Sequence, residues 1–240
     1  MAVNSIRIHR PSDRSLFLIA AIVFPLAVLI GYFKSYYFVN FFPESRPIAN
    51  SLVHFHGIVM SAWVLYFVAP VALVRTKNLK LHISMGFAGI GLAALVVIVG
   101  FATAYDSHLV RKVAPPGFNP FGFTILPGWD MLLFVVFFAA AIYFRKRPAE
   151  HKSLMLLTAI NFAPAALFRF PMIPPELTLP IAMGVPAAFA VGALIWHTVK
   201  HGKMNRVFAI GVGVLLISIP IRLALINSPA YISLIERIAP

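Results

Sequence analysis

The chain has 240 residues, of which 60% are hydrophobic and 11% are charged, and it contains no cysteine. Soluble domains have about 45–50% apolar and about 25% charged residues, so this composition excludes a soluble domain. It also excludes a disordered chain, a disulfide scaffold and a cysteine-based zinc site. What remains is a bundle of helices embedded in a membrane.

Runs of about 20 uncharged residues are long enough to cross a hydrocarbon core of ~30 Å. They predict an all-α bundle of seven transmembrane helices in one integral membrane domain, residues 1–240. The predicted helices are residues 15–33, 53–74, 83–105, 128–144, 153–170, 177–199 and 207–227.

The net charge of +13 is unevenly distributed among the loops. If the N-terminus and the second, fourth and sixth loops share one side, that side has a net charge of +11 and the opposite side +2. Basic loops face the cytoplasm, so this asymmetry predicts a cytoplasmic N-terminus and a C-terminus outside. It also indicates that lipid phosphates, and not nucleic acid, supply the counter-charge.

Two segments outside the predicted spans carry structural signals. Residues 106–127 are rich in Pro, Gly and Phe and lack helical periodicity. Long loops of this kind are often lids or binding loops, and we expect Phe118, Phe121 and Phe123 to fold back onto the bundle mouth. Residues 230–240 have apolar residues at helical spacing, which predicts a short interfacial helix.

Polar residues on four predicted helices fall at one depth near the outer face, where we expect a ligand-binding pocket. A charged residue within a span is costly, so each one is a candidate for a functional site. We expect one arginine to pair with an aspartate there, and the other to hold a small anionic or amphipathic ligand. The pocket residues are His54, His56, Asp130, Arg169 and Arg222.

Each member of this outer group also has a structural explanation. Arg169 and Arg222 could reach lipid phosphates, and Asp130 could stabilise the start of its helix. His54 and His56 are two residues apart, so on a helix they point about 200° apart and cannot both bind one ion.

Histidines also open two predicted helices at the inner face. His82 and His151 share a His-x-Ser-apolar pattern, which indicates a weak hairpin repeat that has Asn205 in its third copy. A pair of histidines could hold haem b or a transition metal, and the candidate ligands are His54, His56, His82 and His151. Histidines beside basic loops can also simply lie at headgroup level. Of the other nearby residues, Glu150 and Asn205 make poor third ligands.

Four stretches of the chain resemble a group of uncharacterised bacterial inner-membrane proteins. They are His-Gly-Ile-Val-Met-Ser-Ala-Trp-Val-Leu (56–65), Leu-His-Ile-Ser-Met-Gly (81–86), Pro-Ala-Glu-His-Lys-Ser-Leu-Met-Leu-Leu (148–157) and Pro-Ile-Arg-Leu-Ala-Leu (220–225). The resemblance implies a multi-pass protein of the bacterial inner (plasma) membrane and no particular activity. Members often have a histidine where this chain has Asn205. More distantly, the His-bearing helix starts are similar to those of small membrane haem and oxidase-assembly proteins.

Three hypotheses for the function follow. The chain could bind haem b or a metal in a redox or assembly role, bind or transport a small anionic or amphipathic ligand, or serve as a structural subunit of a larger membrane complex. The sequence has no phosphate-binding loop, no Gly-x-Ser-x-Gly and no His-Glu-x-x-His, so it assigns no residue to catalysis and leaves open whether the protein is an enzyme.

Overall fold

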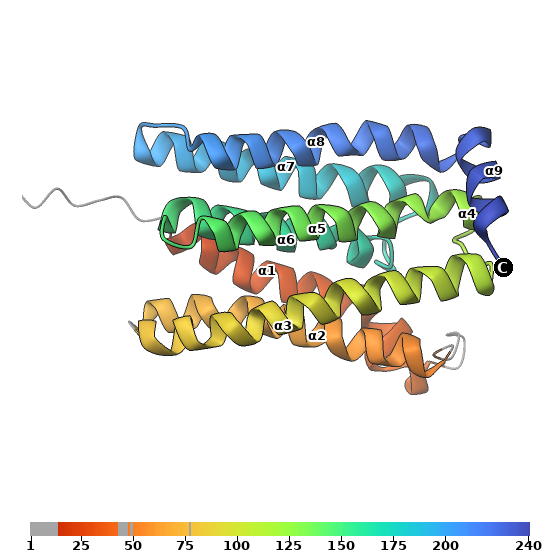
Figure 1. The fold of residues 1–240 in the computed structure, drawn as a ribbon, viewed down its shortest axis with the longest axis horizontal. Helices are drawn as coiled ribbons and strands as arrows, with labels where there is room; N and C mark the ends of the chain where they lie inside the picture. Colours follow the sequence, from red (N-terminus) through yellow and green to blue (C-terminus); the bar gives the residue numbers. More distant parts are fainter. Residues whose placement is uncertain (1–13, 43–47, 49, 77) are drawn as a thin grey trace, which may run out of the picture.

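The computed structural model describes residues 14–42, 48, 50–76 and 78–240, and within these residues the chain is helical and has no strand (Figure 1). The α-helices are α1 (Arg14–Tyr32), α2 (Ser51–Arg75), α3 (Leu79–Ala104), α4 (Pro120–Phe123), α5 (Ile125–Tyr143), α6 (Pro148–Leu167), α7 (Pro175–His201), α8 (Arg206–Ile226) and α9 (Pro229–Ile238). Three short helices of other types are η1 (Phe33–Tyr37), η2 (Val39–Phe41) and η3 (Tyr105–Val110).

The long helices lie side by side along the long axis of the molecule (Figure 1). The turns α2–α3, α5–α6 and α7–α8 gather at one end, and α4 and α9 close the other. We call the first the basic end, because its turns and the adjoining helix ends contain Lys80, residues 145–147, Lys200 and Lys203, and the second the far end. The predicted charge asymmetry also depends on Arg7, Arg10 and Lys77, which lie outside the described residues.

Each of the seven predicted helices overlaps one long helix among the described residues, and all seven begin earlier than predicted, α3 and α6 by the most. Helix α6 starts at Pro148 because proline lacks the N–H that the first turn of a helix leaves unbonded anyway. Helix α3 starts at Leu79 because the side chain of Asn78 accepts a hydrogen bond from the Leu81 N–H at 3.2 Å. The prediction placed both starts too late because it counted only uncharged residues, and the first turns of these two helices contain charged ones.

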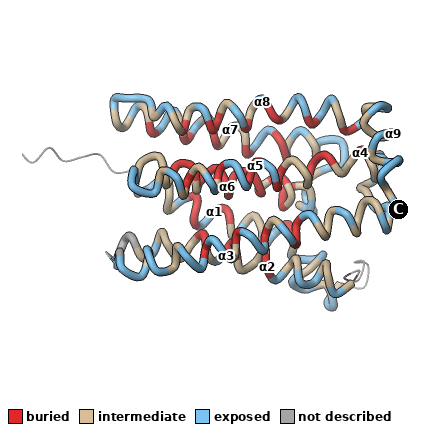
Figure 2. The backbone as a smooth tube through the Cα atoms, viewed as in Figure 1, coloured by how far each residue is buried: buried red, intermediate tan, exposed pale blue. Residues whose placement is uncertain are grey.

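Helix α6 is the least apolar of the long helices, and it is also the most buried (Figure 2). The other six are long and apolar enough to cross a membrane, whereas α6 has Glu150, His151 and Lys152 in its first two turns and Asn161 further along. It packs against α1, α5, α7 and α8, so protein covers most of its surface. A seventh span through α6 stays a prediction.

Aromatic rings join α2, α5 and α6 in the middle of the bundle. Trp63 of α2 is fully buried, and its ring meets that of Phe134 on α5 edge-on, with 4.8 Å between centroids. Phe134 in turn lies 5.0 Å from the ring of Phe162 on α6. Such pairs add about 0.5–1.5 kcal/mol each beyond their buried area.

The segment after α3 is more ordered than the sequence predicts. The prediction of no helical order in residues 106–127 is wrong, because η3 continues α3 to Val110 and Asn119 caps the short helix α4. The predicted return onto the bundle is confirmed for Phe118 and Phe123, which pack against the small buried cluster of Ile125, Leu126, Met183 and Ile226.

The predicted C-terminal helix is present as α9, which lies across the far end (Figure 1). Ser228 caps its first turn, and the hydroxyl groups of Tyr231 and Thr124 are 2.9 Å apart in a hydrogen bond. Leu234 and Ile238 remain exposed on α9. The helix therefore attaches to α4 while presenting apolar side chains outward, as expected at a membrane surface.

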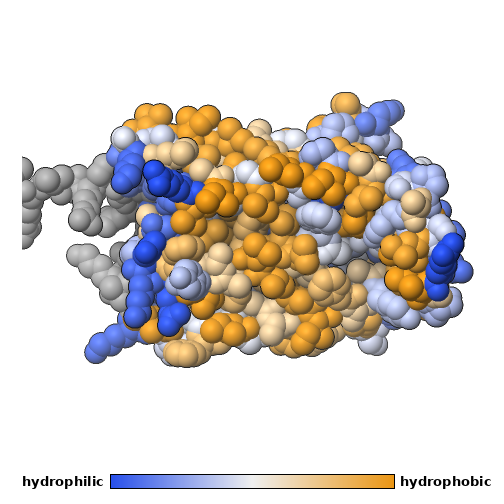
Figure 3. Space-filling model, turned by 45° about the horizontal axis from the view of Figure 1, so that its top comes forward, coloured by the Kyte–Doolittle hydropathy of each residue, from blue (hydrophilic) through white to orange (hydrophobic). Residues whose placement is uncertain are grey.

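A hydrophobic band covers the middle of the molecule between two hydrophilic ends (Figure 3). Large apolar side chains within it are open to the surroundings, including Phe87 at 77% exposure and Leu65 at 68%. A continuous apolar surface of this kind requires a lipid environment, which agrees with a multi-pass membrane protein.

We expect Gly31→Ala to destabilise the bundle, because a Cβ atom at Gly31 would collide with the backbone carbonyl of Ala166. Overpacking of this kind costs about 1–3 kcal/mol, or a fall in Tm of roughly 2–10 °C in a detergent melting experiment. Gly192→Ala is the matched control, because a Cβ there meets open space. Equal melting of both variants would show that α1 and α6 do not approach so closely.

Candidate functional site

Asp130 and Arg222 form a buried ion pair near the far end. Arg222 donates from Nη1 to Asp130 Oδ1 at 2.7 Å, and the two residues are only 2% and 8% exposed. The predicted pairing of Asp130 with one of the two arginines is thus confirmed, and the partner is Arg222. In a low-dielectric interior each charge offsets the desolvation cost of the other.

Ser218 of α8 and Asn161 of α6 make further hydrogen bonds to this pair. Arg222 donates to the Ser218 carbonyl at 3.3 Å and to its hydroxyl at 3.0 Å, one turn back on α8. Asn161 of α6 donates from Nδ2 to the backbone carbonyl of Asp130 at 2.8 Å. The pair therefore connects α5, α6 and α8 through polar contacts that hydrocarbon cannot replace.

A cavity of about 10 Å³ lies beside the pair, lined by residues of α6, α7 and α8 that include Asn161, Pro164, Pro186 and Arg222. This volume accommodates about one water molecule. The buried Oδ1 atom of Asn161 has no hydrogen-bond partner among the described residues, so a water here would satisfy it. An organic ligand does not fit.

Arg169 has a different environment from Arg222. It is exposed just after the end of α6, donates from Nη1 to the Ala165 carbonyl at 2.6 Å, and lies over the Tyr32 ring of α1 at 4.7 Å. The close approach of Gly31 to Ala166 brings these two helix ends together. Among the described residues, no carboxylate pairs with Arg169.

Two histidines lie within electrostatic range of Arg169. They are His56 on α2 and His108 on η3. The Nδ1 atom of His56 is buried and makes no hydrogen bond to any described residue, whereas Nδ1 of His108 bonds the Val113 carbonyl at 2.6 Å. The His108 ring also contacts Phe123 of α4, with 5.3 Å between centroids. Arg169, His56 and His108, which we call the Arg169 cluster, thus join cationic and imidazole groups to an aromatic wall.

His54 belongs to neither group. Its Nδ1 atom lies 3.3 Å from the Tyr36 hydroxyl, which also donates to the His54 carbonyl at 3.0 Å. Tyr36 packs against Gly57, where a side chain would leave no room for the ring. The structure therefore divides the predicted outer group into a buried pair, the Arg169 cluster and the His54–Tyr36 contact.

At the basic end, His82 of α3 and His151 of α6 are neighbours, with ring centroids 6.4 Å apart. Among the described residues, no group of three or more His, Cys, Asp or Glu side chains could hold a metal ion. Asn205, which occupies the third repeat position, caps α8 by accepting from the Phe208 N–H at 3.1 Å. The polar residues that follow the three basic turns therefore have different roles: His82 and His151 are neighbours, and Asn205 caps its helix.

The sequence interpretation missed Asn161, Ser218, Tyr32 and His108. Asn161 is the one polar amide in the apolar stretch of its helix, and Ser218 lies one turn before Arg222, so both had a detectable signal. Tyr32 and His108 had none, because their role depends on contacts between helices that are distant in the sequence.

Comparison with known protein-family models, with curated proteins and with solved structures finds no match to this chain. The resemblance to uncharacterised bacterial inner-membrane proteins therefore stays a prediction, and the function has to be argued from the residues themselves.

Asp130→Asn and Arg222→Gln should each destabilise the bundle, because either change leaves one buried charge uncompensated. A loss of about 3–5 kcal/mol is expected for each, measured by thermal melting in detergent. The double variant should melt well above the value expected from adding the two losses, since it removes both charges. Arg169→Gln should melt like the parent. Additive losses in the double variant would contradict a direct pair.

Proposed function

We propose that this protein binds an anionic amphipathic molecule, such as one with a phosphate or carboxylate headgroup, at the far end of the bundle. The observation that carries the proposal is the environment of Arg169, an exposed guanidinium with two imidazoles nearby and no carboxylate partner among the described residues. A planar guanidinium matches the two oxygens of such a headgroup.

The buried pair is a poor candidate for this role. The Arg222 charge is already compensated by Asp130, and the adjacent cavity has room for about one water molecule. An anion that displaced Asp130 would leave a buried carboxylate without its partner, at a cost of several kcal/mol. We therefore assign anion binding to Arg169 and stabilisation of the fold to Arg222.

The apolar neighbours of the Arg169 cluster favour an amphipathic ligand over a fully polar one. Tyr32 lies beneath the guanidinium, and its neighbours in the chain, Ile30 at the end of α1 and Phe33 at the start of η1, have about 40% of their surfaces exposed. On the other side, His108 contacts Phe123, which packs against Phe168 at 6.2 Å. A headgroup could meet the charges while its chain lies along the hydrophobic band.

The topology that goes with this proposal has seven spans, including α6, with the basic end in the cytoplasm. Support comes from the basic turns of that end and from the length of α6, whose 20 residues would extend about 30 Å. The far end, with Arg169 and α9, then lies outside an inner (plasma) membrane. The ligand would enter from the outer leaflet or from the periplasmic side.

Native mass spectrometry with dioctanoyl phosphatidic acid tests this proposal, and dioctanoyl phosphatidylcholine serves as the zwitterionic comparison. We expect the parent to prefer phosphatidic acid and Arg169→Gln to bind it about tenfold more weakly, which corresponds to the loss of one charge-assisted hydrogen bond. His56→Gln should also weaken binding.

Arg237→Gln is the matched control, because Arg237 is an exposed arginine on α9 at the same end. Equal binding of phosphatidic acid by the parent, Arg169→Gln and Arg237→Gln would reject an Arg169 site. In that case a structural subunit without a ligand is the better description.

A further inference from the structure

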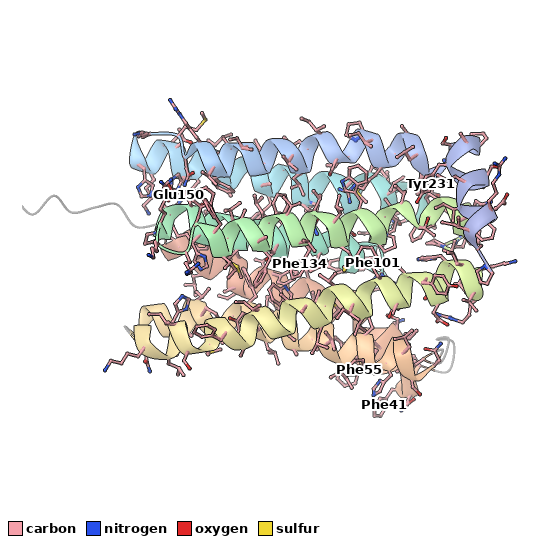
Figure 4. The ribbon with its side chains drawn as sticks, in the orientation of Figure 1. Phe41, Phe55, Phe101, Phe134, Glu150 and Tyr231 are labelled. Atoms are coloured by element: carbon pink, nitrogen blue, oxygen red, sulfur yellow. The ribbon has the colours of Figure 1, made fainter. Side chains whose placement is uncertain are left out.

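The two histidines at the basic end come from helices that are distant in the sequence. His82 lies in the first turn of α3 and His151 in the first turn of α6, and their rings meet at 6.4 Å between centroids with 78° between planes. Figure 4 shows this end of α6, marked by the adjacent Glu150, opposite the end marked by Tyr231. The two rings are thus far from the Arg169 cluster.

A hydrogen bond to the backbone orients the His151 imidazole. Its Nδ1 atom is 2.8 Å from the Ala141 carbonyl, and since a carbonyl only accepts, Nδ1 carries the proton. Ala141 lies in the last turn of α5, where the amides of Phe144 and Arg145 bond Ala140 and Ile142 and leave the Ala141 carbonyl available. In the neutral ring Nε2 then keeps its lone pair, which is the arrangement typical of metal-binding histidines.

His82 has an unsatisfied nitrogen next to this ring. Its Nδ1 atom is buried and has no hydrogen-bond partner within the part of the chain that the structure describes. Buried polar atoms without partners are uncommon and need an explanation, such as an absent ion. A metal bound between the two imidazoles would supply the missing partner.

The separation of the rings is short enough for one ion to lie between them. With metal–nitrogen bonds of about 2.0 Å, two imidazoles on one ion have ring centres about 5–6 Å apart. The observed 6.4 Å is close to this range.

Each histidine has a methionine one turn further along its helix. Met85 follows His82 by three residues and Met155 follows His151 by four, spacings that place each methionine on the same helix face as its histidine. Both methionines are half-buried. Thioether sulfur selects Cu(I), and the described residues provide no third His, Cys, Asp or Glu ligand for a harder ion.

We propose that His82 and His151 bind Cu(I) at the basic end, with Met85 and Met155 as adjoining thioether donors. The neighbouring turn of Arg145, Lys146 and Arg147 repels a monovalent ion less than a divalent one, which adds to the preference. This site is separate from the Arg169 cluster, and it does not depend on the binding of an amphipathic anion there.

The test is Cu(I) binding by the full-length protein in detergent under anaerobic, reducing conditions, in competition with bicinchoninate and with metal content measured after desalting. We expect one Cu(I) per chain and X-ray absorption that shows nitrogen neighbours at about 2.0 Å. His82→Gln and His151→Gln should each weaken binding at least tenfold. Cu(I) should raise the Tm of the parent and leave that of His151→Gln unchanged.

The controls separate loss of the ligand from loss of the fold. Met85→Leu and Met155→Leu conserve side-chain volume, so they should fold normally and still bind Cu(I) more weakly. His54→Gln, at the far end, should bind like the parent. The proposal is overturned if the parent retains no copper, if both histidine variants retain it equally, or if haem occupies the same two histidines and gives a six-coordinate Soret spectrum.

Discussion

The charged groups inside this bundle depend on partners within the protein, because the hydrocarbon around the hydrophobic band offers none. The least apolar long helix, α6, is accordingly the one that four other helices surround. Its Asn161 reaches the backbone of Asp130, and Asp130 in turn binds Arg222. The arrangement of α5, α6 and α8 follows from this requirement as much as from apolar packing.

The helices could be predicted from the sequence, whereas the grouping of the polar residues could not. Hydropathy is a local property, so uncharged runs locate each helix to within a few residues. Contacts between helices depend on how each one is rotated about its axis, and helices that are apolar all round carry little information about that rotation. Arg169 and Arg222 look alike in the sequence, at similar depth, yet one is exposed and the other is 2% exposed in an ion pair. The histidine pair was easier to anticipate, because His82 and His151 follow two similar basic turns.

The two ends of the bundle offer different chemistry. The far end has a guanidinium and imidazoles beside aromatic rings, which suit a hard, delocalised anion. The basic end brings together two imidazoles, each followed one helical turn later by a methionine, a combination that suits a soft cation. Between them lies an aromatic core around Trp63 and Phe134. The two sites can therefore be altered one at a time.

The partners of the buried ion pair are 92 residues apart in the chain, and this separation affects how the protein is made. At synthesis rates of about 5–20 residues per second, Asp130 leaves the ribosome on the order of 5–20 s before Arg222. During that interval helix α5 carries a carboxylate without its guanidinium. Asp130 is in the second turn of α5, near the far end, where its carboxylate can stay hydrated until Arg222 has been made. Once α8 has been made, Arg222 can pair with Asp130, and the carboxylate no longer needs water to offset its charge.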